Sequence, residues 1–208
     1  FSVTVLMPGE EFSYNGVVGR RTAARGFLPA PAYVGGETVQ ETGGGVCQGS
    51  STVYLAALRS NLEIVERYPH GYITRYVPDG MDATVYYGAK DFRFRNNTPF
   101  PIQVVGSVSG RSLTVSILGT KSDNITVEMT NQTVGTTGYK TVYKVDSSLP
   151  AGSTRVSVTP YAGYTVKVYR NLYENGKLKD TKLESTSVYR SRDKVVLVSP
   201  EDAAQYGL

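Results

Sequence analysis

Most of this chain consists of short runs in which apolar and polar residues alternate, separated by glycine, proline and asparagine. Such alternation is typical of strands that bury one face. Helical spacing of apolar residues stands out over residues 49–60, where it is carried by Val53, Tyr54, Ala57 and Leu58. The 22 glycines and 16 tyrosines among 208 residues also favour strands and turns. We therefore expect an α+β fold: an N-terminal mixed domain with one main helix and an antiparallel sheet, and an all-β C-terminal domain.

The strands expected in the N-terminal domain are short. They are residues 1–5, 34–40, 83–87, 91–96, 102–106 and 113–118. The last four follow one another closely, with turn residues between them, and this spacing predicts an antiparallel sheet.

The basic residues change in kind near residues 120–124. Before this point nine of ten are arginine, and after it eight of twelve are lysine. Alternating apolar residues then continue to residue 198, and Asn175-Gly176 between two such runs predicts a tight hairpin. We expect one domain over residues 1–120 and a β domain over residues 121–208.

Cys47 is the only cysteine of the chain and lies in the run Gly43-Gly44-Gly45-Val46-Cys47-Gln48, just ahead of the helical pattern. The hydroxyls of Ser50, Ser51 and Thr52 are expected to cap that helix. A helix N-terminus favours an anion, so we expect a lowered pKa for Cys47 and a role as a nucleophile. The alternative is a buried cysteine with an inert thiol, which is the common fate of a free cysteine.

The same turn offers donors for an oxyanion. Gly45 and Gln48 flank the nucleophile, and we expect them to stabilise the charge that develops on an acyl substrate. The alternative for Gln48 is a solvent-facing position at the start of the helix.

His70 is the only histidine, and we expect it to be the general base and acid for Cys47. A third group should orient the imidazole, and Asp82 is the best candidate, with Asp79 and Asp91 as alternatives. Asp82 could instead support a tight turn beside Gly80. A zinc site is not expected because one cysteine and one histidine do not supply the usual ligands.

Several motifs of the first 118 residues together resemble the VanW family of cell-envelope proteins. They are Pro8 to Asn15, Val18-Gly19-Arg20-Arg21-Thr22, Gly43 to Gln48, Glu66-Arg67 with His70, Gly80 to Val85, and Asp91-Phe92 with Asn96-Asn97. His70 matches the family histidine, although Gly71 follows it where many members have serine. The chain order of Cys47 and His70 is the reverse of that in the YkuD-type L,D-transpeptidases.

This resemblance implies a peptidoglycan L,D-transpeptidase. Cys47 would attack the bond after the third residue of a stem peptide, release the terminal D-residue, and pass the acyl group to an amine to form a 3-3 crosslink. Two alternatives remain: a cysteine carboxypeptidase or amidase in which water resolves the acyl-enzyme, and a noncatalytic wall-binding module. The resemblance also implies an extracytoplasmic location in the cell envelope. Any attachment to a membrane would come from a segment outside this chain.

Such a substrate carries free carboxylates, and side chains suited to bind it cluster around His70. They are Arg67, Tyr72, Arg75 and Tyr76. Arginine forks bind carboxylates well, so we predict that these residues contact the substrate. The alternative is a solvated strand face.

From Thr141 to Val198 the chain resembles a G5 module, the glycine-marked β fold of surface and wall-binding proteins. This resemblance implies attachment to wall glycan or to another partner. The net charge of +4 is small and neither half contains a basic run, so we expect no nucleic-acid partner. We expect no cofactor.

Overall fold

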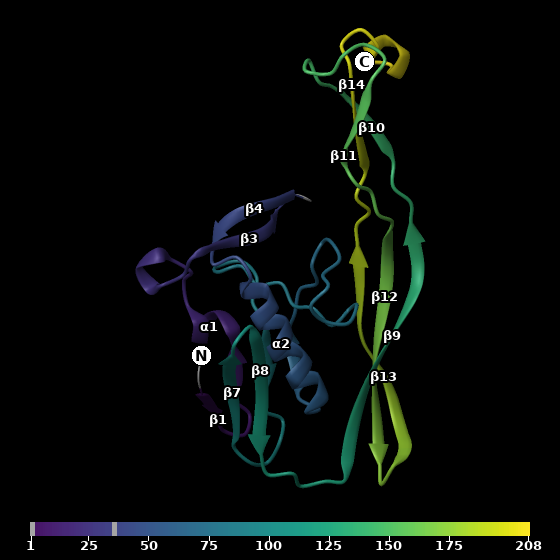
Figure 1. The fold of residues 1–208 in the computed structure, drawn as a ribbon. Coiled ribbons are helices and arrows are strands. Elements are labelled where there is room, and N and C mark those ends of the chain that lie inside the picture. The colour runs from purple at the N-terminus through teal and green to yellow at the C-terminus, as the bar shows by residue number, and fades with distance from the viewer. Residues whose placement is uncertain (1–2, 35–36) are drawn as a thin grey trace. The chain divides into compact units, whose positions relative to one another are not determined.

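The computed structural model describes residues 3–34 and 37–208. The protein is mostly β with one long helix, as Figure 1 shows. The helices are α1 (Tyr14–Val18) and α2 (Val46–Arg59), with 3-10 turns η1 (Ala23–Arg25) and η2 (Ala203–Tyr206). The strands are β1 (Val3–Leu6), β2 (Glu11–Ser13), β3 (Pro29–Val34), β4 (Glu37–Thr42), β5 (Glu63–Glu66), β6 (Arg93–Arg95), β7 (Ile102–Ser109), β8 (Ser112–Gly119), β9 (Ile125–Thr137), β10 (Thr141–Val145), β11 (Thr154–Val158), β12 (Gly163–Glu174), β13 (Lys177–Tyr189) and β14 (Lys194–Val198).

The chain forms two compact units. The first contains Phe1–His70, Thr74–Gln132 and Val166–Ser187, and the second contains Gly71–Ile73, Thr133–Thr165 and Val188–Leu208. The chain therefore leaves the first unit directly after His70 and re-enters it at Thr74.

The first unit is built around α2. The helix buries the apolar face predicted from its spacing, with Val53, Tyr54, Ala57 and Leu58 all 1% exposed or less. It contacts β8 of the sheet β1-β7-β8 and β5 of the sheet β2-β6-β5. Buried aromatic rings fill the space between these elements: Tyr54 meets Phe92 edge-on, and Phe92 and Phe94 lie side by side.

The predicted antiparallel sheet is divided between two sheets. β7 pairs with β8 and with β1, all antiparallel, whereas β6 pairs with β2 and β5. Residues 83–87 form no strand, and that prediction is wrong. Their backbone is bonded elsewhere: the Thr84 N–H donates to the Tyr68 carbonyl at 2.7 Å, and Tyr86 forms only an isolated bridge with Lys90.

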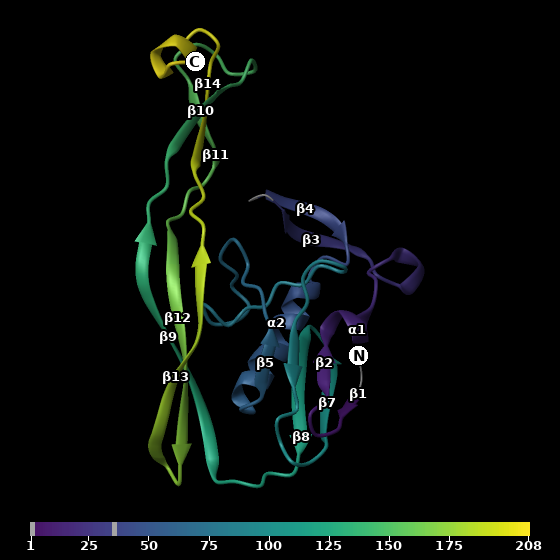
Figure 2. The ribbon, with the colours of Figure 1, turned by 180° about the vertical axis from the view of Figure 1, so that it is seen from behind.

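A hairpin of β3 and β4 leads into α2. Figures 1 and 2 show it at the end of the helix where α2 begins. The predicted strand over residues 34–40 falls partly on residues 35–36, which lie outside the described residues. A side chain at Gly44 would overlap the Ala30 carbonyl of β3, so this position requires glycine.

The start of α2 differs from the prediction. The helix begins at Val46 and places Cys47 inside its first turn, with Gly45 as the capping residue at φ 85° and no side-chain cap. Ser50, Ser51 and Thr52 lie within the helix, and the prediction that they cap it is wrong. Their hydroxyls bond to helix carbonyls and, for the two serines, to Ala83.

Strands β9, β12 and β13 form one sheet in the order β13-β12-β9. The predicted tight turn joins β12 to β13 through Asn175 and Gly176, both at positive φ, and this prediction is confirmed. In the first unit Arg170 of β12 is buried, pairs with Glu184 at 2.9 Å and donates to the Leu62 carbonyl at 2.9 Å. Residues of these strands thus complete the interior of that unit.

The second unit contains the sheet β10-β14-β11. β14 lies in the centre, parallel to β10 and antiparallel to β11. Tyr143 of β10 packs its ring on Tyr206 of η2, with 4.5 Å between ring centroids.

Candidate active site

Cys47 occupies the second position of α2 and is half-buried. Its Sγ lies 3.6 Å from the carbonyl oxygen of Val85. Burial raises the pKa of this thiol, but a hydrogen bond with His70 and the positive charges of His70 and Arg21 outweigh it. The pKa of Cys47 is therefore lowered from its ordinary value, and the thiolate is favoured beside the imidazole.

His70 is oriented by Asp82. Its Nδ1 lies 2.6 Å from Asp82 Oδ2, and its backbone N–H donates to the same oxygen at 2.7 Å. Burial lowers the pKa of His70, but the bond to Asp82 and the interaction with Cys47 raise it to about 9. A carboxylate at Nδ1 holds the proton there and leaves Nε2 for exchange with a substrate or the thiol. The structure thus brings together Cys47, His70 and Asp82, three residues that the sequence analysis predicted to act as one site.

Asp82 is itself held by Arg67. The Asp82 side chain is 1% exposed and that of Arg67 is 6% exposed, and they form an ion pair at 3.2 Å. The guanidinium also donates to the carbonyls of Asp82 and Gly80 and to Ser187 Oγ, at 2.7, 2.9 and 2.8 Å. Because these internal acceptors engage the buried guanidinium, Arg67 positions Asp82 instead of facing a substrate, which corrects our prediction of its role.

Of the other three residues predicted to bind substrate, Tyr76 contacts the triad. The Tyr76 hydroxyl lies 3.2 Å from His70 Nε2, so this residue does reach the site. Burial and the charge of Cys47 raise the pKa of Tyr76, which keeps its phenol protonated. Tyr72 belongs to the second unit, together with Gly71, whose carbonyl accepts from the Arg190 N–H. The side chain of Arg75 is exposed.

Two serines of α2 hold the segment that carries Asp82. Ser51 Oγ donates to the Cys47 carbonyl at 2.7 Å and accepts from the Ala83 N–H at 2.9 Å. Ser50 Oγ donates to the Ala83 carbonyl at 2.6 Å. Both side chains are completely buried. The sequence analysis missed this role because their position before an apolar helical pattern is also typical of caps.

The predicted oxyanion donors lie on the exposed side of the first turn. Gly45 and Gln48 are exposed, and the Gln48 backbone N–H donates to the Gly45 carbonyl at 3.0 Å. Because the backbone N–H of Gln48 is engaged in this bond, the predicted donation to an oxyanion has to come from the side-chain amide of Gln48.

Tyr14 and Arg21 were not among the predicted site residues. The Tyr14 hydroxyl donates to the Val46 carbonyl at 3.2 Å, and burial raises the pKa of Tyr14 to about 12. Arg21 places its guanidinium carbon 5.8 Å from the centre of the Tyr14 ring. A signal for Arg21 was present, since it lies in one of the motifs of the VanW resemblance.

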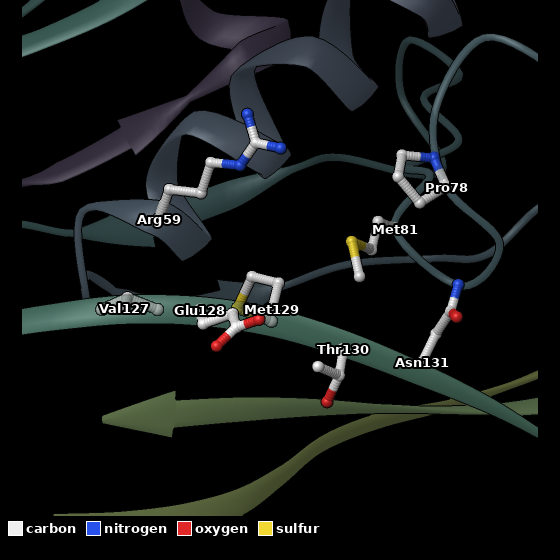
Figure 3. Close-up of a pocket in the computed structure, with 8 residues that line it drawn as sticks. All are labelled: Arg59, Pro78, Met81, Val127, Glu128, Met129, Thr130 and Asn131. Atoms are coloured by element: carbon white, nitrogen blue, oxygen red, sulfur yellow. The ribbon is translucent and has the colours of Figure 1, made fainter. Parts of the chain in front are cut away.

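A cavity of about 480 Å³ lies elsewhere in the first unit, between the end of α2, the segment Pro78–Met81 and β9. Figure 3 shows Met81 and Met129 beside it, with Arg59 on the helix. Cys47, His70 and Asp82 do not line this cavity, so it is separate from the candidate site.

Comparison with known families gives a match over each part of the chain. The family described as "VanW like protein" matches residues 1–118, which is more than half of the chain. The chain belongs to the VanW-like family. The G5 domain family matches residues 125–200, so this VanW-like region is followed by a G5 region, in the order that we predicted.

Two curated relatives match part of this chain. The uncharacterized protein YoaR of Bacillus subtilis (strain 168) is 45% identical over 113 residues, which cover 54% of this chain and 37% of YoaR. The vancomycin B-type resistance protein VanW of Enterococcus faecalis (strain ATCC 700802 / V583) is 23% identical over 137 residues, covering 62% of this chain and 49% of that protein. The VanW-like chain thus matches less than half of the length of either relative.

Two solved structures of G5 domains match part of this VanW-like chain. HP0197-G5 is 24% identical and covers 36% of this chain and 96% of its own, with a TM-score of 0.21. The IgA1 protease G5 domain is 16% identical and covers 38% of this chain and 94% of its own, with a TM-score of 0.26. These TM-scores are too low to support a structural argument.

Among the described residues, no helix has the length and apolar character needed to cross a bilayer.

Proposed function

We propose that this chain is a cysteine acyltransferase of the cell wall, an L,D-transpeptidase acting on peptidoglycan stem peptides. The observation that carries the proposal is the pairing of His70 with the buried Asp82, together with the interaction of His70 with the Cys47 thiol, which lowers the pKa of that thiol. This is the arrangement of nucleophile, base and orienting carboxylate that acyl transfer uses on unrelated folds. The VanW-like and G5 matches support association with the cell wall.

The first half-reaction forms a thioester. The Cys47 thiolate attacks the carbonyl carbon of the L,D peptide bond, and the carbonyl oxygen becomes an oxyanion near the first turn of α2. The carbon–nitrogen bond then breaks, and the leaving amine takes a proton from the His70 imidazolium. The terminal D-residue departs, leaving the stem peptide bound to sulfur.

The second half-reaction transfers the acyl group. An amine of a neighbouring stem peptide gives a proton to His70 and attacks the thioester carbon. The carbon–sulfur bond breaks, a 3-3 crosslink forms and the thiolate is regenerated. If water attacks in place of the amine, the same site is a carboxypeptidase, and the difference depends on how far water is excluded.

The G5 region supplies a second proposal of a different kind. In this proposal residues 125–200 bind wall glycan or a wall-associated partner and the chain has no chemistry of its own. The two proposals differ in what they require of Cys47, because binding alone does not need a reactive thiol.

Mass spectrometry of tetrapeptide muropeptides separates these possibilities. We would incubate them with the parent protein and with Cys47→Ala, and record both the muropeptides and the intact protein mass. Crosslinked dimers and a transient acyl adduct with the parent alone support transpeptidation, and tripeptide without dimers supports a carboxypeptidase. Unchanged muropeptides without an adduct overturn both enzymatic proposals. Co-sedimentation of either protein with isolated peptidoglycan then tests binding.

A further inference from the structure

Arg21 carries a positive charge that acts on Cys47 and that the triad does not use. Its side chain starts against the glycine-rich run before the nucleophile: a Cβ at Gly43 would lie 2.7 Å from the Cβ of Arg21. Gly43 is at φ 81°, where glycine is favoured in any case. The aliphatic part of the Arg21 side chain is thus packed against the backbone of Gly43, four residues before Cys47.

Two tyrosine rings flank the guanidinium. Its central carbon lies 5.8 Å from the centre of the Tyr14 ring and 5.9 Å from that of Tyr87. Tyr14 in turn bonds to the carbonyl of Val46, the residue next to Cys47. Aromatic rings on a cation hold it in place but accept none of its in-plane hydrogen bonds.

One edge of the guanidinium has a partner and the other does not. Nη1 donates to the Gly19 carbonyl at 3.0 Å, whereas Nη2 is buried and has no hydrogen-bond partner among the described residues. A buried donor without an acceptor is unfavourable, and in native structures such groups are commonly satisfied by a ligand, an ion or an ordered water.

No carboxylate of the described part of the chain pairs with Arg21. The charge of Asp91 acts on Arg21, but no ion pair joins them among the described residues, and the Asp91 oxygens accept from Ser13 Oγ and from the N–H groups of Asn15 and Phe92. Two further arginines, Arg20 and Arg25, lie in the same loop: Arg20 stacks on Tyr87 and Arg25 donates to the Val18 and Arg20 carbonyls. The local field therefore favours an anion from outside.

We infer that Arg21 binds the terminal carboxylate of the residue that leaves when Cys47 attacks, so that the donor peptide must end one residue after the cleaved bond. This inference rests on the proposed function and adds a rule for the substrate. The α-carboxylate of a terminal residue is the anion fixed closest to the scissile carbonyl, and the charge of Arg21 acts at the Cys47 sulfur. A planar guanidinium edge suits a carboxylate, and its charge offsets the repulsion between that carboxylate and the thiolate.

Binding tests this rule without catalysis. Calorimetry would measure a stem tetrapeptide with a free C-terminal carboxylate, and the same peptide as its C-terminal amide, on Cys47→Ala and on Cys47→Ala with Arg21→Met. We expect Cys47→Ala to bind the acid about 10- to 100-fold more tightly than the amide, the range of a charge-assisted hydrogen bond, and the double variant to lose this preference. Equal binding of acid and amide to Cys47→Ala overturns the inference.

Turnover separates failure of the inference from failure of the proposed function. With Cys47 present, Arg21→Met should reduce the ratio of kcat/KM for acid over amide toward one, and Arg21→Lys should retain part of it because the charge remains. Arg20→Met is the matched control and should keep the ratio. Acid-selective binding with no turnover by the parent refutes the enzymatic proposal alone, whereas turnover with a ratio unaffected by Arg21→Met refutes the carboxylate site. Thermal unfolding of each variant verifies that it is folded.

Discussion

Asp82 holds His70 at two points, accepting from the imidazole Nδ1 at 2.6 Å and from the backbone N–H of the same residue at 2.7 Å. The carboxylate therefore fixes both the position of the main chain and the direction of the ring. A ring held in this way presents Nε2 in one orientation, as a general base requires.

The thiol of Cys47 should be reactive at a lower pH than an ordinary thiol. Its pKa is lowered despite burial because His70 interacts with it. A lowered pKa means that the thiolate persists as the pH falls, so the midpoint of alkylation by iodoacetamide shifts downward. Since Cys47 is the sole cysteine, the mass of the intact protein reports this rate directly.

His70→Gln is the companion variant in that experiment. It should move the alkylation midpoint upward, toward that of a buried thiol without a cationic neighbour. Identical pH profiles for the parent and His70→Gln would show that the two side chains do not interact in solution.

Asp82→Asn removes the charge that pairs with Arg67 and should lower stability. In the protein that remains folded it should reduce acyl transfer by about 100-fold or more, because an amide no longer fixes the imidazole tautomer or stabilises its charged form. The variant should also lower the pKa of His70 from its value of about 9, since the bond to Asp82 is the largest cause that raises it. Histidine NMR titration measures the pKa without reference to activity. An unchanged titration would contradict the role of Asp82.

Arg67→Met should destabilise the protein strongly. The substitution removes one of the two cationic side chains that pair with the buried Asp82, the other being His70, and breaking a buried pair costs about 3–5 kcal/mol. Chemical denaturation measures the free energy of unfolding. Arg95→Met is the matched control: Arg95 pairs with Glu11 and Glu63 at the surface, and its loss should change stability little. A small effect of Arg67→Met would show that Asp82 is held by other means.

Ser51→Ala should cost about 1–3 kcal/mol, because it leaves the buried N–H of Ala83 without its acceptor. Thr52→Ala removes a hydroxyl that bonds only within the helix, and it serves as the control. Equal stability of the two variants would count against the bridge from Ser51 to Ala83.

The triad could be predicted from sequence because Cys47 and His70 are unique and Asp82 lies in a short motif of the resemblance. The helix start could not be predicted from its hydroxyls, because a glycine at positive φ begins the helix without a side-chain cap. Residues 83–87 alternate like a strand, yet serine hydroxyls of α2 and the Tyr68 carbonyl satisfy the backbone of Ala83 and Thr84. Such long-range side-chain bonds leave no periodic signal in the sequence.

Ser187 and Arg170 lie within the G5 match, yet the first bonds to Arg67 and the second to the Leu62 carbonyl. A gene fragment encoding only residues 1–118 would lack both of these bonds. The surroundings of the candidate site therefore include side chains from both matched regions. A chimera that exchanges the G5 sequence has to keep a serine and an arginine at these positions, because their bonds are made to residues of the VanW-like region.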